Sequence, residues 1–288
     1  MFLNLKYHIV SLVAVFLALG LGILIGSAFP GDTTLISQQQ QLVGRLESRI
    51  ESIRQKNESL RARINQLEMD RDIRGQFELQ VLPTLVEGKL RGRSVAILAT
   101  GGHVTEDLAV TLQLAGATIQ SSTILEEALK NREEVLKKLD WPDMDQKSFL
   151  SRVAGEISSA VMSGETRTTK ILAGEGVLKI SGRYGGTVSD VVIVGGNNRI
   201  EKGMDSHFID FFTNRGISVF GAEESFAAYS CMKDYQKKGL ATVDNIDTVP
   251  GQVSLVYAMS GRPGHYGIKS TARSLLPVIG EGVEANAR

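Results

Sequence analysis

The chain lacks most of what a disulfide-stabilised or zinc-binding protein needs. Of its 288 residues, one is cysteine, four are histidine and seven are methionine. A single cysteine excludes an intrachain disulfide and a cysteine-based zinc cluster. No histidine-rich or methionine-rich tract occurs either. The disulfide-rich class of secreted domains is therefore excluded, although a location outside the cytoplasm is not.

The chain also lacks an excess of charge. Its 32 basic residues balance 32 acidic residues, so the formal net charge is zero. Because nucleic-acid-binding domains usually carry a basic excess, we expect no nucleic-acid partner. Hydrophobic residues make up 42% of the chain and charged residues 22%, which excludes a chain that is disordered throughout.

What the sequence does have is a long uncharged run near its start, IVSLVAVFLALGLGILIGSAF at residues 9–29. As a helix this run spans about 31 Å, close to the thickness of a bilayer's hydrocarbon core. A cleaved signal peptide is the alternative, but its apolar region usually has only about 7–15 residues. We therefore predict an uncleaved membrane anchor over residues 1–30.

The flanks of this run predict its orientation. Lys6 precedes the run, and no lysine or arginine follows it until Arg45. The positive-inside rule then places the N-terminus in the cytoplasm and everything after Pro30 outside. We expect a single-pass protein of the cell membrane with an extracytoplasmic C-terminal domain.

Small residues recur every four positions in the predicted anchor, at Ala14, Ala18, Gly22 and Gly26. Such a stripe lets two helix backbones approach each other closely in lipid. It favours dimerisation through this face, although glycine and alanine are also common in membrane helices generally.

Residues 31–80 carry a heptad repeat that predicts a parallel coiled-coil stalk. Between Val43 and Leu67, Asn57 is the single polar residue among eight core positions. β-branched residues at a and mostly leucine at d favour two parallel strands, and one core Asn fixes their register. The charges that flank this core support the parallel coil only in part. Across the two helices, Arg49 would face Arg54 and Lys56 would face Arg61, which are repulsive pairs, and only Arg63 with Glu68 is attractive. A single amphipathic helix folded onto the next domain is the alternative.

Residues 90–288 predict an α/β domain. Short apolar strands are expected at 94–99, 117–122, 191–194, 217–220 and 240–243. Helical patterns lie between them, including 124–139, 148–162, 223–237 and a last helix capped by Thr248 with Pro250 in its first turn. This alternation is typical of a Rossmann-like or flavodoxin-like parallel sheet with helices on both faces. The Gly-rich segment 177–187 is open to two interpretations, a hairpin or an irregular excursion.

Two Gly-rich loops, 100–103 and 195–198, would lie where such sheets bind ligands. Neither contains G-x-G-x-x-G or a P-loop lysine, and no acidic residue closes the second strand to hold a ribose. We interpret them as strand-to-helix turns. An enzyme or small-ligand site lined by His103 and Asn197 is the alternative.

Catalytic and metal-binding signatures are weak. No G-x-S-x-G elbow exists, and Cys231 falls in a helical pattern, so no enzyme is predicted. The soft and borderline metal donors are His103, His207, Cys231, Met232 and His265. Thiolate and thioether suit Cu(I), which makes copper the candidate ion. On a helix, however, neighbouring side chains point about 100° apart, so Cys231 and Met232 would not easily share an ion.

Two parts of the chain resemble a known family. The segment YHIVSLVAVFLALGLG at 7–22 resembles the opening of the bacterial copper-transport protein B (MctB) family. The motifs VDNIDT at 243–248, GQ at 251–252, GHYG at 264–267 and LLP at 275–277 resemble its C-terminal signature. The resemblance implies copper homeostasis or transport at the cell envelope. Some members are described as channel or efflux components, and related members are linked to envelope assembly and division.

These observations together predict a dimeric membrane-anchored protein with a role in copper homeostasis. The alternative is a non-enzymatic scaffold whose extracytoplasmic domain docks envelope or division proteins. Since one membrane helix per chain cannot enclose a pore, the residues support family membership better than a channel.

Overall fold

The structure is a computed structural model that describes residues 5–28, 33–100, 106–126, 132–196 and 202–279. The chain divides into two compact units, Met1–Ile73 and Arg74–Arg288. Helix α1 (Leu5–Ala28) and most of α2 (Thr33–Val86) form the first unit. The remaining helices and all described strands belong to the second.

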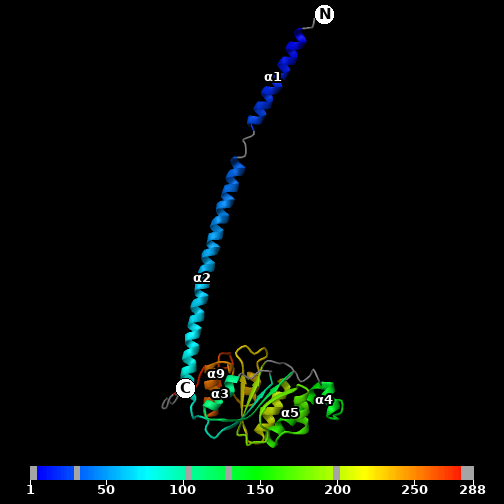
Figure 1. Ribbon diagram of the computed structural model, residues 1–288, viewed down its shortest axis with the longest axis vertical. Coiled ribbons are helices and arrows are strands. Elements are labelled where there is room, and N and C mark those ends of the chain that lie inside the picture. The colour runs from blue at the N-terminus through cyan, green and yellow to red at the C-terminus, as the bar shows by residue number, and fades with distance from the viewer. Residues whose placement is uncertain (1–4, 29–32, 101–105, 127–131, 197–201, 280–288) are drawn as a thin grey trace. The chain divides into compact units, whose positions relative to one another are not determined.

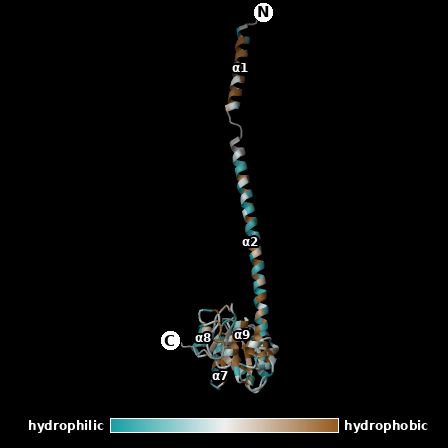
Figure 2. Cartoon of the chain, turned by 90° about the vertical axis from the view of Figure 1, so that its left-hand side faces the viewer, coloured by the Kyte–Doolittle hydropathy of each residue, from teal (hydrophilic) through white to brown (hydrophobic). Residues whose placement is uncertain are grey.

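Helix α1 is predominantly apolar, as the brown of much of its ribbon in Figure 2 shows. Residues Lys6–Ala28 have a mean hydropathy of 2.8, and none of the window that gives this value is buried against the rest of the chain. By length and composition, α1 is able to cross a membrane.

Helix α2 is mainly polar (Figure 2), and between Val43 and Leu67 apolar residues recur at heptad spacing and form a seam. Between 52% and 60% of each of these side chains is exposed: Val43, Leu46, Ile50, Ile53, Leu60, Ile64 and Leu67. A groove of about 470 Å³ runs beside Asn57 and is lined by Ile50, Ile53, Arg54, Asn57, Glu58 and Arg61. Within one chain, this seam has no core to enter.

A seven-stranded sheet in the order β3-β2-β1-β4-β5-β6-β7 organises the second unit. Its strands are β1 (Ser94–Ala99), β2 (Thr118–Leu125), β3 (Leu178–Gly182), β4 (Asp190–Gly195), β5 (Ser218–Glu223), β6 (Ala241–Val243) and β7 (His265–Tyr266). The order is that of the doubly wound Rossmann sheet rather than the flavodoxin-like one. The chain reverses direction across the sheet between the neighbouring strands β1 and β4.

Side chains alternate along the central strands and build two cores. Val191 and Ile193 of β4 enter one core, whereas Val192 and Val194 enter the other. Helices α3 (Glu106–Leu114) and α9 (Val249–Met259) cover one face, as Figure 1 shows, together with the end of α2. The opposite face is covered by α4 (Arg132–Lys138), α5 (Gln146–Ser163), α6 (Arg167–Gly174), α7 (Lys202–Thr213) and α8 (Met232–Lys237).

The expected α/β class is confirmed, but the sheet is mixed rather than purely parallel. The Gly-rich segment supplies β3, which pairs antiparallel with β2. All other ladders between named strands are parallel. The chain leaves β2, passes through α4, α5 and α6, and then forms β3 beside β2 in the opposite direction. This antiparallel pairing needs no parallel crossover, and β3 lies at the edge of the sheet.

Several predicted boundaries are wrong. Strand β2 runs to Leu125, so the helix expected from Ile124 begins only at Arg132. The helix expected over 223–237 is reduced to α8. In the segment before α8, a side-chain acceptor takes the place of a helical one, because the Ser225 N–H donates to the Asp247 carboxylate. The predicted cap is confirmed, because the Thr248 hydroxyl accepts the Gly251 N–H at 3.2 Å and Pro250 lies in the first turn of α9.

Candidate functional site

The reversal between β1 and β4 places two loops at the carboxyl edge of the sheet, where doubly wound proteins bind ligands. Thr100 follows β1, and its backbone N–H donates to the Val194 carbonyl at 2.9 Å. Gly196 follows β4 with φ of 100°, a conformation that favours glycine. His103 and Asn197 lie outside the described residues, so the alternative site built on them has no described geometry.

The second strand does end beside an acidic residue, contrary to expectation. Because β2 extends to Leu125, Glu126 follows it directly and is exposed. An acidic residue at this position holds the ribose in dinucleotide-binding sheets. The glycine fingerprint that accompanies it there is absent from this sequence, so the carboxylate stands without its usual phosphate loop.

Cys231 lies immediately before α8 rather than within a helix. Its side chain is 2% exposed, and its Sγ donates to the Tyr229 carbonyl at 3.6 Å. Its backbone N–H donates to Glu223 Oε2 at 2.8 Å. A pocket of about 240 Å³ adjoins the thiol and is lined by Gly203, Asp205, Ser206, Ile209, Cys231, Asp234, Tyr235 and Lys238.

A buried carboxylate and phenol face this thiol. The Tyr235 hydroxyl donates to Asp205 Oδ2 at 2.6 Å, and both residues are 2% exposed. Burial, followed by the Asp205 carboxylate, raises the pKa of Tyr235 well above its usual range. Two glycines make room for the phenol, since a Cβ on Gly195 or Gly221 would collide with the Tyr235 side chain. The hydroxyl is therefore held as a neutral donor.

A buried ion pair lies at the end of β5. The Glu223 carboxylate accepts the Lys269 ammonium at 2.8 Å and the Ser230 hydroxyl at 2.7 Å. Lys269 Nζ also donates to the Glu224 carbonyl at 2.8 Å. The Glu223 side chain is fully buried, so these partners replace the water that it loses. The pair fixes the C-terminal segment against the loop that leads to Cys231.

Two aspartates of the 243–248 motif hold the loops beside this pair. Asp244 Oδ1 accepts the Ile268 N–H at 2.7 Å, and a Cβ on Gly267 would collide with this carboxylate. Asp247 Oδ1 accepts the Ser225 N–H at 2.7 Å and its hydroxyl at 2.9 Å. The motif thus acts as a brace for both loops.

His265 and Met232 occupy other surroundings. The Nδ1 atom of His265 on β7 lies 3.0 Å from the Thr242 Oγ1 atom on β6, with which it shares a hydrogen bond. Burial and the nearby Arg273 guanidinium lower the pKa of His265. Met232 is 1% exposed inside the core beneath α8. The structure therefore brings Cys231 and Met232 together only as chain neighbours.

Within the described ranges, no group of three or more His, Cys, Asp or Glu residues is arranged to hold a metal ion. Of the predicted donors, His103 cannot be placed and His207 lies in a separate pocket between α5 and α7. Cys231 and Asp205 both line the same small pocket, and the Asp205 carboxylate already accepts the Tyr235 hydroxyl.

The predicted dimerisation residues all lie on exposed helix surfaces. Ala14, Ala18, Gly22 and Gly26 follow one another at four-residue spacing on α1, and a Cβ on Gly22 or Gly26 would meet nothing within 4 Å. Asn57 is exposed in the groove of α2. These positions are open to a second copy.

Comparison with known proteins places this architecture in a family. Residues 2–277 match a family described as "Copper transport outer membrane protein, MctB". The chain belongs to the MctB family. The match extends over both units of the chain, from the apolar helix to the C-terminal motifs. The resemblance predicted from residues 7–22 and 243–277 is confirmed.

Curated MctB relatives cover the chain almost completely. They include proteins named "Copper transporter MctB" from Mycobacterium bovis (strain ATCC BAA-935 / AF2122/97) and Mycobacterium tuberculosis (strains CDC 1551 / Oshkosh and ATCC 25618 / H37Rv). Each is 26% identical to this chain over 317 aligned positions, with 95% of this chain and 98% of the relative covered. The MctB family is described as a transport family and not as a class of enzyme.

Sequence reasoning missed the residues that organise the carboxyl edge. Glu223 fell in a predicted helix, and Asp205 and Lys269 belonged to no motif under consideration. One signal was available for Asp244 and Asp247. They stand three residues apart directly after a predicted strand, where short acidic side chains commonly bind loop N–H groups.

Proposed function

We propose that this MctB-family chain is a single-pass envelope protein that takes part in copper homeostasis, with copper as its cargo. The observation that carries the proposal is the family match over residues 2–277, which includes the apolar helix α1. Lys6 before α1 and the absence of basic residues until Arg45 support a cytoplasmic N-terminus. The α/β unit then lies outside the cytoplasmic membrane.

The orientation is tested in intact cells that carry an epitope tag on the C-terminus. External protease should remove this tag before the cells are lysed, while a tag on the N-terminus should survive. A C-terminal tag that is protected in intact cells, or a mature protein recovered from the soluble fraction, would overturn the proposed topology.

We propose further that two copies associate in parallel through the seam of α2. Burying a valine, leucine or isoleucine that is now exposed contributes about 1.5–3 kcal/mol, and each chain offers seven such core residues. Asn57 can pair with its equivalent only in the parallel, in-register arrangement, which opposes other oligomers. This favourable burial has to exceed the repulsion between the basic residues that flank the seam, Arg49, Arg54, Lys56 and Arg61.

Copper binding is tested by anaerobic titration of the full chain in detergent with Cu(I) and a competing chelator. Direct handling predicts binding at micromolar or tighter concentration, lost in Cys231→Ser and weakened in Met232→Leu and His265→Gln. Met69→Leu is the matched control, because Met69 is 65% exposed on α2 and far from these donors in sequence. The absence of saturable Cu(I) binding would contradict direct handling by these residues.

A scaffold for envelope assembly or division is the second candidate function. The observation that favours it is the display of apolar residues on braced loops. Phe226 is 94% exposed beside Ser225, which Asp247 holds, and Ile268 is 60% exposed beside the contacts of Asp244. Rigid exposed aromatic residues are typical of protein-binding surfaces. Normal copper tolerance but defective division in cells with Phe226→Ser would favour this function over copper homeostasis.

A further inference from the structure

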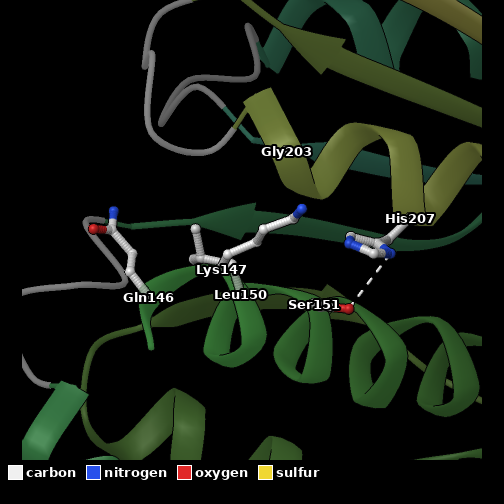
Figure 3. Close-up of a pocket in the computed structure, with 6 residues that line it drawn as sticks. All are labelled: Gln146, Lys147, Leu150, Ser151, Gly203 and His207. Atoms are coloured by element: carbon white, nitrogen blue, oxygen red, sulfur yellow. Dashed lines mark hydrogen bonds between the residues drawn. The ribbon is translucent and has the colours of Figure 1, made fainter. Parts of the chain in front are cut away.

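A second pocket lies between α5 and α7 and shares one lining residue, Gly203, with the Cys231 pocket. It has a volume of about 250 Å³ and is lined by Gln146, Lys147, Leu150, Ser151, Gly203 and His207. Figure 3 shows the Lys147 side chain extending from α5 toward the space below Gly203, with the His207 ring at the other end of that space. Two nitrogen-bearing side chains from different helices therefore converge on one cavity.

The lining consists mainly of hydrogen-bond donors. The Lys147 ammonium can donate three hydrogen bonds, while the Ser151 hydroxyl and the His207 ring each provide a further group, with Ser151 Oγ 3.5 Å from His207 Nδ1. Gly203 is the second residue of α7, and N–H groups in the first turn of a helix have no acceptor within that helix. Neither aspartate nor glutamate is among the six lining residues.

The aspartates of these elements interact with other groups, and Glu156 of α5 is not among the residues that line the pocket. Asp145 caps α5 by accepting the Ser148 N–H at 2.7 Å, and hydrogen bonds from the Ser148 side chain and backbone lower its pKa, with a smaller contribution from the Lys147 ammonium. On α7, Asp205 accepts the Tyr235 hydroxyl, and Asp210 accepts a lysine ammonium at 2.6 Å. These interactions leave the positive charge of Lys147 without a counter-ion in the lining of the pocket.

We propose that this pocket binds a small anionic molecule through an oxyanion group, phosphate or carboxylate, held between Lys147 and His207. Leu150, which is buried, gives the pocket an apolar wall for a short carbon chain. The volume is below the usual range for drug-sized ligands, so the ligand has few heavy atoms. The pocket uses none of Cys231, Met232 and His265, and it shares no lining residue with the groove of α2.

The test uses the full chain in a non-ionic detergent, which excludes lipid phosphate. Inorganic phosphate and acetate are titrated separately by calorimetry, and the rise in melting temperature is followed in parallel. One saturable site is expected for at least one anion, and the stronger of the two identifies the group. Lys147→Met should weaken this binding at least about tenfold, since a hydrogen bond to a charged group is lost.

Gly203→Leu should abolish binding by filling the pocket. A Cβ at Gly203 meets nothing within 4 Å, so the first atom of the new side chain enters open space. Lys170→Met on α6 is the matched control, because Lys170 is also exposed but lies outside this pocket. The Lys170→Met variant should bind the anion with the affinity of the wild type.

The proposal is overturned if neither anion binds saturably, or if Lys147→Met binds as the wild type does. Circular dichroism checks that each variant is folded. Should Gly203→Leu disturb the fold, the exposed Lys147→Met variant still decides the outcome.

Discussion

The two units of this chain treat their apolar side chains in opposite ways. In the first unit, Leu60 on α2 is 58% exposed and Phe16 on α1 is 65% exposed, whereas in the second unit Val192 and Phe208 are fully buried. The α/β unit therefore buries most of its hydrophobic residues by itself. The first unit exposes its apolar residues within the single chain, and by our proposals they are buried in lipid for α1 and in a second copy for α2.

The largest expected effect comes from placing a charge in the seam of α2. Leu60→Asp should destabilise the proposed dimer by about 5 kcal/mol, because two leucines lose their burial and two carboxylates replace them. Sedimentation of the full chain in detergent should then report a monomer, with the melting of the α/β unit unchanged. Ser59→Asp, one residue away but off the seam, is the control. A Leu60→Asp variant that stays dimeric would contradict the coiled coil.

In the α/β unit, loss of the buried ion pair is expected to lower the free energy of unfolding by about 3–5 kcal/mol. Glu223→Ala leaves Lys269 without its carboxylate partner in a largely buried position, and breaking a buried pair has this cost. Urea unfolding of the α/β unit should show a lower free energy of unfolding, while the dimer persists. Glu51→Ala on exposed α2 should change neither quantity. Equal stability of Glu223→Ala and wild type would mean that the pair is only a surface interaction.

The third effect concerns alkaline pH. Burial raises the pKa of Tyr184 to about 12, and its hydroxyl shares a 2.7 Å hydrogen bond with the Thr123 hydroxyl. The phenol ionises first in the unfolded state, so the free energy of unfolding should fall by about 2 kcal/mol as the pH rises from 10 to 12. Tyr184→Phe should flatten this fall, and Tyr229→Phe, which is half exposed, should not.

The smallest effect sharpens the proposal for the seam. Asn57→Leu removes the single polar core residue, so the melting temperature of the stalk should rise, with about 1 kcal/mol gained. The variant should also populate oligomers larger than a dimer, because the register is no longer fixed. Thermal denaturation followed by circular dichroism measures the melting temperature, and sedimentation equilibrium measures the oligomeric state. An unchanged melting temperature would place Asn57 outside the core of the coil.

Elements that depend on local sequence patterns were predictable in both units. In α1 the 21-residue run required only length and hydropathy, and the heptad of α2 required only periodicity, so both helices were predictable. The strands β1 and β4 were also predictable, because short apolar runs between glycines are typical of buried parallel strands.

The rest depended on contacts between residues far apart in the chain. The helix predicted over 223–237 failed because Glu223, Asp247 and Lys269 lie 22 residues or more apart and share one network. Periodicity cannot detect such acceptors. For the same reason, the pocket between α5 and α7 was invisible, since Lys147 and His207 meet only after both helices pack. The cap at Thr248 was predictable because its partner, Gly251, is local.

The outer strands of the sheet have a consequence for a protein concentrated on a surface. Edge strand β3 has five residues and ends at a glycine, and edge strand β7 has two. Long free edges invite neighbouring sheets to join, which leads to aggregation. Because both edge strands are short, many copies can lie close together without strand pairing between their sheets.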